Sequence, residues 1–409
     1  MYFNNLYSKQ EVIMKSVLII GGGASGITAA ICLARSRADV HITVLEKNDR
    51  ILKKLLSTGN GKCNITNTAV SPAVYDSAFA GELIASLDFA AIEAYLASLS
   101  LPIKADREGR CYPLSESAKN VVNTLLRETD RLGIEVHCGQ AVERIWRQGD
   151  RVYAQAGTRY SADALIFAIG SAAAVKGYNG AALCRQLGWQ FAPPTPALCP
   201  IPSEEAFLKE LKGVRAKGCI RLGARKQRGE IQFAEHAVSG ICAFNLAKYV
   251  RAGDILELDF APEEIDKAAL RRYLTAAANS ARENAALLDF LLVRKLGTVL
   301  IKRAGLKPSA SPQDLSAQDI ENILAQITAF KVRVQPPRDF QKAQTVCGGV
   351  DARFADAATL AAKGQRGIFL CGEILDADAP CGGFNLHWAW ASGIRAAQSA
   401  EQYLFGSKK

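Results

Sequence analysis

A glycine-rich turn near the N-terminus constrains the fold of this chain more than any other feature. Residues 17–20 are apolar, and three consecutive glycines follow, so that Gly21, Gly23 and Gly26 stand at the spacing Gly-x-Gly-x-x-Gly. An alanine-rich run begins directly behind them, which predicts a strand, a tight turn and a helix. The first glycine permits the bend, the second lets the backbone approach a pyrophosphate, and the third allows close packing of helix on strand. The sequence therefore predicts a dinucleotide-binding turn whose helix N-terminus faces phosphates.

A carboxylate follows the next predicted strand at the position that this interpretation needs. Residues 40–45 are mostly apolar, and Glu46 comes directly after them, twenty residues past Gly26. An acid at that point accepts hydrogen bonds from the ribose hydroxyls of an adenosine. The alternative is an ordinary βαβ unit that binds no ligand. Strand, glycines, helix, second strand and acid together favour nucleotide binding.

The length and composition argue against several classes of protein. The chain has 409 residues, enough for two or three domains, and its 11 cysteines include no Cys-x-x-Cys pair. This pattern argues against a disulfide framework, a metal ribbon and a dithiol redox site, so we expect no metal and a reducing, cytoplasmic location. The net charge is +10, but Lys and Arg occur in no run of five or more. We therefore expect a solvated basic surface without a nucleic-acid or membrane partner.

The segment behind Glu46 predicts a loop, a helix and a returning strand. Residues 52–67 combine glycine, serine, threonine, asparagine and lysine at a density that predicts a loop with many free N–H groups. Residues 79–100 have the composition of one helix, and residues 135–145 that of one strand. Residues 164–169 predict a buried parallel strand that ends in glycine and rejoins the nucleotide-binding sheet.

A change in the residue pattern near residue 193 predicts inserted domains. Short alternating stretches there predict a small β-barrel-like domain, and a helical block follows in which Ser316 is the expected N-cap of the last helix. The parallel sheet is expected to resume at residues 343–346. The expected domains are an N-terminal, disordered extension at 1–15, a nucleotide-binding domain at 16–192 and 343–409, a β-barrel-like insert at 193–261 and 331–342, and a helical insert at 262–330.

A second informative stretch lies near the C-terminus. Residues 368–371 predict a buried strand that ends in Gly372 and Glu373, and open α/β sheets bind ligands at the carboxyl ends of their strands. A helix that begins near Gly383 is expected to point its N-terminus into the same crevice. A helix dipole at that place would stabilise the negative charge of a reduced flavin and raise its reduction potential.

Three further motifs together resemble those of one flavoprotein family. They are Lys-Leu-Leu-Ser-Thr-Gly-Asn-Gly-Lys-Cys-Asn-Ile-Thr-Asn at 54–67, Gly-Arg-Cys-Tyr-Pro at 109–113, and a segment at 371–393 that contains Cys-Gly-Gly-Phe-Asn-Leu-His-Trp-Ala-Trp. With the N-terminal glycines, they resemble the BaiN/YhiN-like family of NAD(P)/FAD-dependent oxidoreductases, which includes proteins described as aminoacetone oxidases. The resemblance implies an α/β fold with a discontinuous Rossmann-like FAD-binding domain, an inserted β-barrel and a helical domain. It also implies FAD as the cofactor.

The resemblance further implies which residues of this chain contact FAD. The glycine turn would meet the pyrophosphate, Glu46 the adenosine ribose, and the start of the C-terminal helix the isoalloxazine. The implied contacts are Gly21, Gly23, Ala24, Ser25, Gly26, Glu46, Lys47, Lys54, Gly59, Asn60, Gly61, Cys63, Asn64, Val142, Ala168, Gly170, Gly372, Glu373, Asp376, Gly382, Gly383, Phe384, Asn385 and Leu386. The chain departs from the family at Ser171, where glycine is usual, and at His387, where glutamine is usual.

Reduction of a C=C or C=N bond needs an acid as well as a hydride. His387 or Tyr112 could supply the proton, and Arg110 in the same motif as Tyr112 is a third candidate for a catalytic role. The alternative for His387 is a hydrogen-bonded helix residue. If His387 is the acid, His387→Gln should leave FAD bound and move the pH–rate profile.

The sequence leaves three functions open. The first is a reductase that takes hydride from NAD(P)H and delivers it through flavin N5 to a small organic substrate. Because the insert has no second Gly-x-Gly-x-x-Gly with a trailing acid, NAD(P)H would dock transiently over the flavin. The second is an amine oxidase, similar to aminoacetone oxidase, that produces hydrogen peroxide. The third is an RNA-binding, tRNA-modifying flavoprotein, which the lack of an RNA-binding motif disfavours. The oligomeric state is not predicted.

Overall fold

The structure is a computed structural model that describes residues 14–77, 79–335 and 339–406. The chain divides into two compact units. Unit 1 contains Met1–Ala172, Lys176–Pro194 and Cys347–Lys409, and unit 2 contains Ala173–Val175 and Thr195–Val346. The extension expected at residues 1–15 lies almost entirely outside the described residues.

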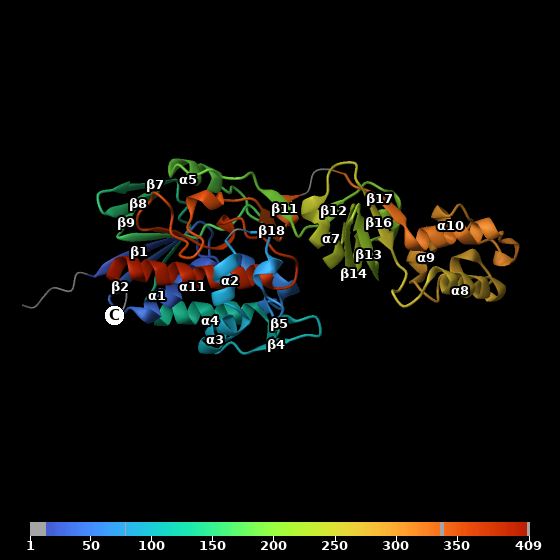
Figure 1. The fold of residues 1–409 in the computed structure, drawn as a ribbon, viewed down its shortest axis with the longest axis horizontal. Coiled ribbons are helices and arrows are strands. Elements are labelled where there is room, and N and C mark those ends of the chain that lie inside the picture. The colour runs from blue at the N-terminus through green and yellow to red at the C-terminus, as the bar shows by residue number, and fades with distance from the viewer. Residues whose placement is uncertain (1–13, 78, 336–338, 407–409) are drawn as a thin grey trace, which may run out of the picture. The chain divides into compact units, whose positions relative to one another are not determined.

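A five-stranded parallel sheet forms the centre of unit 1 (Figure 1). In the central strand, Ile19 pairs with Ile166 on one side and with Val44 on the other. The strands are rich in buried apolar side chains, as expected for a parallel sheet covered on both faces. The carboxyl ends of all five strands meet at one edge of the sheet, where such folds bind ligands. The order is β19 (Ile368–Leu370), β10 (Ala164–Phe167), β1 (Lys15–Ile20), β2 (Val40–Glu46) and β6 (Glu135–Cys138).

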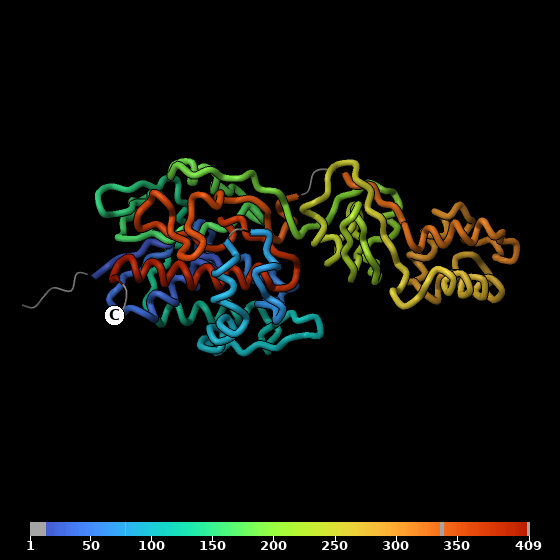
Figure 2. The backbone as a smooth tube through the Cα atoms, viewed as in Figure 1, coloured from blue at the N-terminus to red at the C-terminus, as the bar shows by residue number. Residues whose placement is uncertain are grey.

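The first and last helices of unit 1 lie side by side. α1 (Ala24–Ser36) follows β1, and α11 (Phe384–Phe405) is the last element along the chain. Figures 1 and 2 show the red C-terminal helix running along the blue N-terminal segment. Gly393 permits this approach, because a Cβ added there would lie 2.5 Å from the carbonyl oxygen of Ser25.

The remaining elements of unit 1 form two small antiparallel sheets and several short helices. One sheet has the order β3-β5-β4 and the other β7-β8-β9. The bounds are η1 Lys53–Gly61, β3 Thr66–Asn67, η2 Pro72–Val74, α2 Gly81–Ser86, α3 Phe89–Ser98, β4 Ile103–Ala105, β5 Arg110–Pro113, α4 Ala118–Arg131, β7 Arg144–Gln148, β8 Arg151–Ala156, β9 Thr158–Ala162, α5 Gly180–Gln186, η7 Ala352–Phe354 and η8 Gly372–Ile374.

Three predictions about this unit were wrong in detail. The helix expected over residues 79–100 is broken into α2 and α3, because the side chain of Asp88 caps a new helix start. The strand expected over residues 135–145 is divided between β6 and β7, which belong to different sheets. The loop expected over residues 52–67 contains the 3-10 turns of η1, interrupted by non-helical backbone at residues 58–60.

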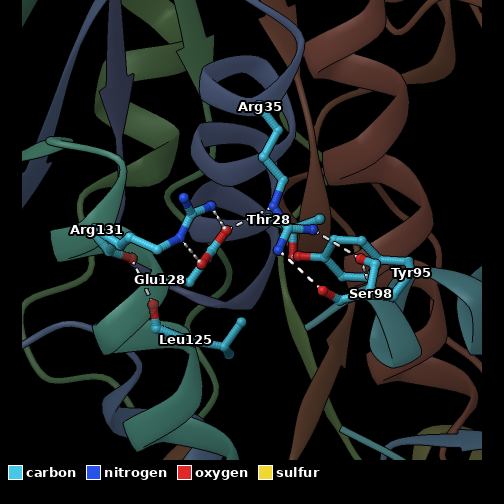
Figure 3. Close-up of polar contacts among 8 residues, drawn as sticks. Thr28, Arg35, Tyr95, Ser98, Leu125, Glu128 and Arg131 are labelled. Atoms are coloured by element: carbon cyan, nitrogen blue, oxygen red, sulfur yellow. Dashed lines mark hydrogen bonds and ion pairs between the residues drawn. The ribbon is translucent and has the colours of Figure 1, made fainter. Parts of the chain in front are cut away.

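A polar network joins α1 to α3 and α4 (Figure 3). Arg35 of α1 donates to Ser98 Oγ at 2.8 Å and forms an ion pair with Glu128 of α4 at 2.7 Å. The hydroxyl of Tyr95 donates to Thr28 Oγ1 at 3.2 Å, and both side chains are buried. α1 is therefore held by polar contacts to α3 and α4 and by packing against α11.

Unit 2 is built on a six-stranded antiparallel sheet with the order β12-β15-β14-β13-β16-β17. Its two edges approach, because Gln335 N–H, just past β17, donates to the carbonyl of Pro202 in β12 at 2.9 Å. The bounds are β12 Ile201–Pro202, α6 Phe207–Leu211, β13 Arg215–Leu222, β14 Arg225–Ala234, β15 Ala237–Ser239, α7 Ile241–Leu246, η3 Ala247–Tyr249, β16 Ile255–Asp259, α8 Lys267–Ser280, η4 Asn284–Ala286, α9 Arg294–Arg303, η5 Pro312–Asp314, α10 Ala317–Thr328, β17 Phe330–Arg333 and η6 Phe340–Lys342.

Two predictions about the insert have opposite outcomes. Ser316 is the N-cap of α10, as expected, and forms a capping box with Asp319. The strand expected at residues 343–346 was wrongly assigned to the parallel sheet. The observed strand, β18 (Thr345–Cys347), instead pairs with β11 (Thr195–Ala197) in a separate two-stranded sheet.

Candidate functional site

The turn between β1 and α1 combines two tightly packed glycines with one open glycine. A Cβ added at Gly21, where φ is +110°, would lie 2.2 Å from the carbonyl oxygen of Ala168. One added at Gly26 would lie 2.0 Å from the carbonyl oxygen of Gly21. Nothing lies within 4 Å of a Cβ added at Gly23. The outer two glycines therefore set the packing, and the middle one leaves open space beside the helix.

The N-terminus of α1 has the electrostatic character of a phosphate site. Gly23 is its N-cap and offers no side chain, and its first turn contains no acidic residue. The leading N–H groups, which belong to Ala24, Ser25 and Gly26, have no partner within the helix and carry the positive end of its dipole. Together with the space at Gly23, this arrangement fits a pyrophosphate.

Glu46 ends β2 directly beside this turn. Its carboxylate accepts hydrogen bonds from Gly22 N–H and Asn48 N–H, each at 2.8 Å, and from the side-chain amide of Asn48. The residue is only 7% exposed. These bonds fix the carboxylate at the strand end, where the ribose-binding acid was expected.

Residues 176–179 form hydrogen bonds with three of the residues that were expected to contact the cofactor. The Lys47 ammonium donates to the first carbonyl of this segment at 3.0 Å. Side chains of the segment donate to the carbonyls of Val142 and Gly170, each at 2.9 Å. Partial burial lowers the pKa of Lys47 below its ordinary value. One connecting segment thus bonds to three of the residues expected to contact the cofactor.

Lys54 and Glu373, which are far apart in the sequence, form an ion pair. The Lys54 ammonium lies 2.6 Å from Glu373 Oε2, and the same oxygen accepts a hydrogen bond from the Ser171 hydroxyl at 3.0 Å. Ser171 stands where the family usually has glycine, so this departure adds a hydroxyl contact to a predicted site carboxylate.

The loop behind Lys54 has left-handed backbone at four predicted contacts. Gly59, Asn60, Gly61 and Cys63 have φ angles between 54° and 84°. Cys63 is fully buried, and burial raises the pKa of its thiol to about 11. The thiol is therefore protonated and unreactive at neutral pH, which favours a packing role.

The start of α11 is fixed against β3. Gly383, its N-cap, has a φ of +99°, and a Cβ there would lie 2.3 Å from the carbonyl oxygen of Thr66. The Asn64 amide lies between that carbonyl and the N–H of Gly383. Asn67 donates to the carbonyl of Gly382 at 2.9 Å. The position of this helix start against the strand is thus set by Asn64, Thr66 and Asn67.

The first turn of α11 is held by further side chains. The hydroxyl of Tyr75 donates to the carbonyl of Phe384 at 2.8 Å. The side chain of Asn385 bonds both backbone groups of Ala379, at 2.9 and 3.0 Å. Leu386 packs against the core, and the turn contains no acidic residue. This helix start can therefore stabilise negative charge on a bound ring.

Gly372 connects the end of β19 to both long helices. Its φ is +78°, and a Cβ there would lie 2.3 Å from Ser25 Oγ. Its N–H donates to Ser392 Oγ at 2.9 Å. Farther along, the Asp376 carboxylate accepts a hydrogen bond from a backbone N–H at 2.9 Å. The predicted contact Gly372 thus lies beside the predicted contact Ser25 at the start of α1.

His387 occupies a structural position. It is 0% exposed, its Nε2 lies 2.9 Å from the carbonyl of Leu87, and its Nδ1 lies 2.8 Å from Thr66 Oγ1. A carbonyl only accepts, so Nε2 carries the proton and Nδ1 accepts from the threonine hydroxyl. Burial lowers the pKa of His387 to about 4. The geometry favours the hydrogen-bonded helix residue over the proton donor expected from its titration range.

Tyr112 and Arg110 lie on the same face of β5. The Tyr112 ring borders the predicted loop, since a Cβ at Gly59 would lie 3.4 Å from it. Burial raises the pKa of the Tyr112 phenol, and the Arg110 guanidinium partly opposes that shift. Arg110 is itself held by Asp106 at 2.7 Å. Tyr112 therefore keeps its proton at neutral pH and lies beside the candidate flavin site.

Sequence reasoning missed several residues that hold this site. Tyr75, Asn67 and Ser392 fix the helix start and Gly372, but they were not among the expected contacts. The partners of Tyr75 and Asn67 lie more than 300 residues away in the chain. A local pattern carries no signal for contacts at such separations.

A family model shows where this chain belongs. The model described as the HI0933-like protein Rossmann domain matches residues 15–399. The chain belongs to the HI0933-like family. This result confirms the family resemblance drawn from the motifs. With the parallel sheet and the glycine turn, it assigns the chain the Rossmann-type FAD-binding fold of an FAD-dependent oxidoreductase.

Two curated relatives match along nearly the whole chain. The chain is 31% identical to the 3-dehydro-bile acid delta(4,6)-reductase of Clostridium scindens, over 95% of this chain and 100% of the relative. It is 26% identical to the ribosomal RNA dihydrouridine synthase of Haemophilus influenzae, over 93% of this chain and 97% of the relative. Both similarities extend through the inserted unit as well as the nucleotide-binding unit.

A comparison with solved structures gives the same fold. A variant of the quinol fumarate reductase protein FrdA from Escherichia coli superposes with a TM-score of 0.50 and 14% identity, over 97% of this chain and 71% of that chain. Among the described residues, no helix is both long and apolar enough to cross a bilayer. The same part of the chain contains no cluster of three His, Cys, Asp or Glu side chains suited to a metal ion.

Proposed function

We propose that this protein uses FAD to carry hydride from NAD(P)H to an electron-poor C=C or C=N bond of a small organic substrate. The observation that carries the proposal is the match over 95% of the chain with a relative named as a delta(4,6)-reductase. A 3-dehydro steroid with such double bonds is a conjugated ketone. Its electron-poor C=C bond belongs to the substrate class expected from the sequence.

The geometry of the candidate site suggests how the chain would hold the cofactor. The N–H groups that begin α1 would bind the pyrophosphate, and Glu46 would accept the ribose hydroxyls. Residues 59–64 and the start of α11 would border the isoalloxazine. When bound, FAD supplies hydride transfer through its N5 atom. The uncapped N-terminus of α11 would then stabilise negative charge on the ring, which favours reduction.

Tyr112 is the proton donor that best fits this reaction. Hydride addition to a conjugated bond leaves negative charge on the substrate, and an acid must neutralise it. Tyr112 holds its proton and borders the loop at Gly59, whereas the Nε2 proton of His387 is committed to Leu87. The positive charge of Arg110 would stabilise negative charge that develops on the phenol oxygen.

A single substitution tests this assignment. Tyr112→Phe should leave FAD bound and its reduction by NAD(P)H unchanged, because neither step needs the phenol. Turnover of a conjugated ketone should fall about 100-fold or more, which is the usual contribution of a positioned acid. Stopped-flow absorbance separates the two half-reactions. Unchanged turnover in the variant would remove Tyr112 from the mechanism.

The hydride source is tested without any substrate. Purified protein with FAD is mixed with NADH or NADPH in the absence of oxygen, and flavin absorbance is followed. Rapid bleaching is the expected result. Persistent flavin colour, together with peroxide release when amines are added in air, would instead establish the amine oxidase considered from the sequence.

A second candidate is reduction of uracil in RNA. It is favoured by the ribosomal RNA dihydrouridine synthases of Haemophilus influenzae and Escherichia coli, which match 93% of this chain at 26% and 23% identity. The C5=C6 bond of uracil is conjugated to a carbonyl, so the same chemistry applies. Dihydrouridine formed in RNA after incubation with enzyme and NAD(P)H would establish this activity, and its absence with active enzyme would exclude it.

A further inference from the structure

The small antiparallel sheet β7-β8-β9 of unit 1 has a buried face and an outer face (Figure 1). Ile145, Val152 and Ala154 are buried, whereas the residues that alternate with them along their strands are at least partly exposed. Successive side chains of a strand point to opposite faces, so the exposed residues share the outer face. That face carries Arg144, Trp146 and Gln148 of β7, Arg151, Tyr153 and Gln155 of β8, and Arg159 and Ser161 of β9.

Two arginines stand in one row across the outer face. Gln155 of β8 pairs with Arg144 of β7 on one side and with Arg159 of β9 on the other. Directly paired residues of an antiparallel sheet point to the same face, so both arginine side chains leave the sheet on its outer side. Their backbones are two strand spacings apart, which is about 10 Å. Strand pairing thus brings together two charges that are dispersed in the sequence.

Two aromatic rings support these arginines. Trp146 and Tyr153 are directly paired, and their rings stack with centres 5.4 Å apart and planes inclined by 11°. The guanidinium carbon of Arg144 lies 5.3 Å from the centre of the Trp146 ring, and that of Arg159 lies 5.2 Å from the centre of the Tyr153 ring. Such cation–π contacts hold a guanidinium without using its N–H donors. The rings therefore orient both groups at the surface of the sheet.

Neighbouring acids do not neutralise Arg144 and Arg159. The strands β7, β8 and β9 contain no Asp or Glu. In the parts of the chain that the structure describes, neither guanidinium group has a hydrogen-bond or ion-pair partner. Arg151 on the same face differs, because its guanidinium lies 3.3 Å from the Asp163 carboxylate. Guanidinium groups with unused donors suit phosphates, which they bind through two parallel hydrogen bonds.

We propose that this outer face binds the phosphate backbone of RNA. We name it the arginine face, and it comprises Arg144, Trp146, Tyr153, Gln155 and Arg159. The proposal rests on the second candidate function, because an RNA substrate needs contacts outside the flavin site that fix its position. Phosphate contacts from arginine side chains serve that purpose in protein–nucleic acid complexes.

A membrane surface fits the arginine face less well. Binding to a bilayer needs apolar side chains that enter the boundary between headgroups and acyl chains. None of the large hydrophobic side chains that are exposed among the described residues lies on β7, β8 or β9. Trp146 and Tyr153 are only partly exposed and stack on each other. A phosphate backbone requires positive charge and hydrogen-bond donors, which this face has.

Binding of a short fluorescent oligouridine tests the proposal. Anisotropy is measured at several salt concentrations for the FAD-loaded protein and for the double variant Arg144→Gln, Arg159→Gln. The variant should bind more weakly, and the slope of log K against log salt should become shallower by about 1.4, because each phosphate neutralised on a single strand contributes roughly 0.7. An affinity and a slope equal to those of the wild type would overturn the proposal.

A charge-matched variant is the control. Lys119→Gln with Arg127→Gln removes the same charge from exposed positions of α4 and should change binding little. Equal losses in both double variants would overturn the proposal, since they would show a response to net charge alone. Binding to phosphatidylglycerol vesicles but not to RNA, lost in the arginine-face variant, would also overturn it.

The same samples distinguish failure of this proposal from failure of the proposed function. Bleaching of FAD by NAD(P)H is recorded for the wild type and both double variants, and all three should bleach alike. Loss of bleaching in the wild type would reject the reductase, whatever the RNA data show. Normal bleaching with no RNA binding by the wild type would reject the arginine face alone.

Discussion

At the scale of single residues, the glycines after β1 differ in how close an added Cβ would lie to neighbouring atoms. Gly26→Ala should lower the free energy of unfolding by about 3 kcal/mol, because its Cβ would lie 2.0 Å from a backbone carbonyl that cannot move alone. Gly23→Ala should leave the cofactor-free protein as stable as the wild type, since nothing lies within 4 Å and its φ of −77° suits alanine. It should nevertheless weaken FAD binding, because the methyl group would occupy the space assigned to the pyrophosphate.

Thermal unfolding of the cofactor-free proteins and titration with FAD measure both quantities. The two alanine variants serve as controls for each other, since they add the same methyl group three residues apart. Wild-type FAD affinity in Gly23→Ala would show that the open space beside α1 is not the pyrophosphate site.

His387 should make stability depend on pH. Its pKa of about 4 in the fold lies below the unperturbed histidine value of about 6.5, so the unfolded chain binds the extra proton first. The contribution of neutral His387 is fully present above pH 6.5 and is lost as the pH falls towards 4. Over that window it amounts to about 3 kcal/mol. Urea unfolding at several pH values should show this decline.

His387→Gln provides the matched variant for that measurement. A glutamine amide can donate to Leu87 and accept from Thr66, so the variant should fold and bind FAD while losing most of the decline between pH 6.5 and 4. We also expect its pH–rate profile to match that of the wild type. A displaced profile would instead restore His387 as the candidate proton donor.

Residue types and spacing predicted the glycine turn and the acid at the end of β2, but not how the candidate site is held together. The glycine turn and Glu46 could be located because their spacing follows directly from the geometry of a strand, a turn and a helix. The role of His387 could not, because its burial depends on Thr66 and Leu87, which lie about 300 residues away. The pKa of a free histidine does not reveal that the side chain is buried in the fold.

At the scale of elements, Glu128 joins helices that the chain separates widely. It accepts from Arg35 of α1 and from Arg131 of its own helix, and its side chain is 12% exposed (Figure 3). Hydrogen bonds from Arg131 and Arg35 lower the pKa of Glu128 to about 2. Glu128→Gln should therefore cost about 1–2 kcal/mol of stability at neutral pH.

The stabilisation by Glu128 should depend on pH. The lowered pKa stabilises the fold above about pH 4.5, the ordinary glutamate value, and that stabilisation disappears as the pH falls towards 2. Chemical unfolding of the wild type and Glu128→Gln should converge over this range. Arg131→Ala removes only the contact within α4 and should cost less, so an equal loss would contradict a role in joining α1 to α4.

Element type was predicted more reliably than element boundaries and pairing. Apolar runs placed β1, β10 and β19 in a buried parallel sheet, because only such a sheet accepts strands without polar alternation. The break at Asp88 was missed, since the flanking residues favour helix and one side-chain cap outweighs them. The pairing of β18 with β11 depends on chain path, which local composition does not encode.

At the scale of the whole molecule, the predicted cofactor contacts all fall within unit 1. FAD should therefore raise the unfolding temperature of that unit, by a stabilisation of about 2.7 kcal/mol at 100 times its dissociation constant. The transition of unit 2 should stay in place. Differential scanning calorimetry with and without FAD measures both. A shift of both transitions by the same amount would show that the cofactor also contacts the insert or that the units unfold together.

The packing of α1 against α11 has a consequence for synthesis on the ribosome. The helix that begins the nucleotide site emerges early, but its packing partner is more than 300 residues downstream, and all of unit 2 is made in between. The antiparallel sheet of unit 2 can therefore form before α11 has been synthesised and has packed against α1. FAD should therefore bind late in synthesis. A chain that stops within α11 would leave the ribosome with the apolar face of α1 still exposed to solvent.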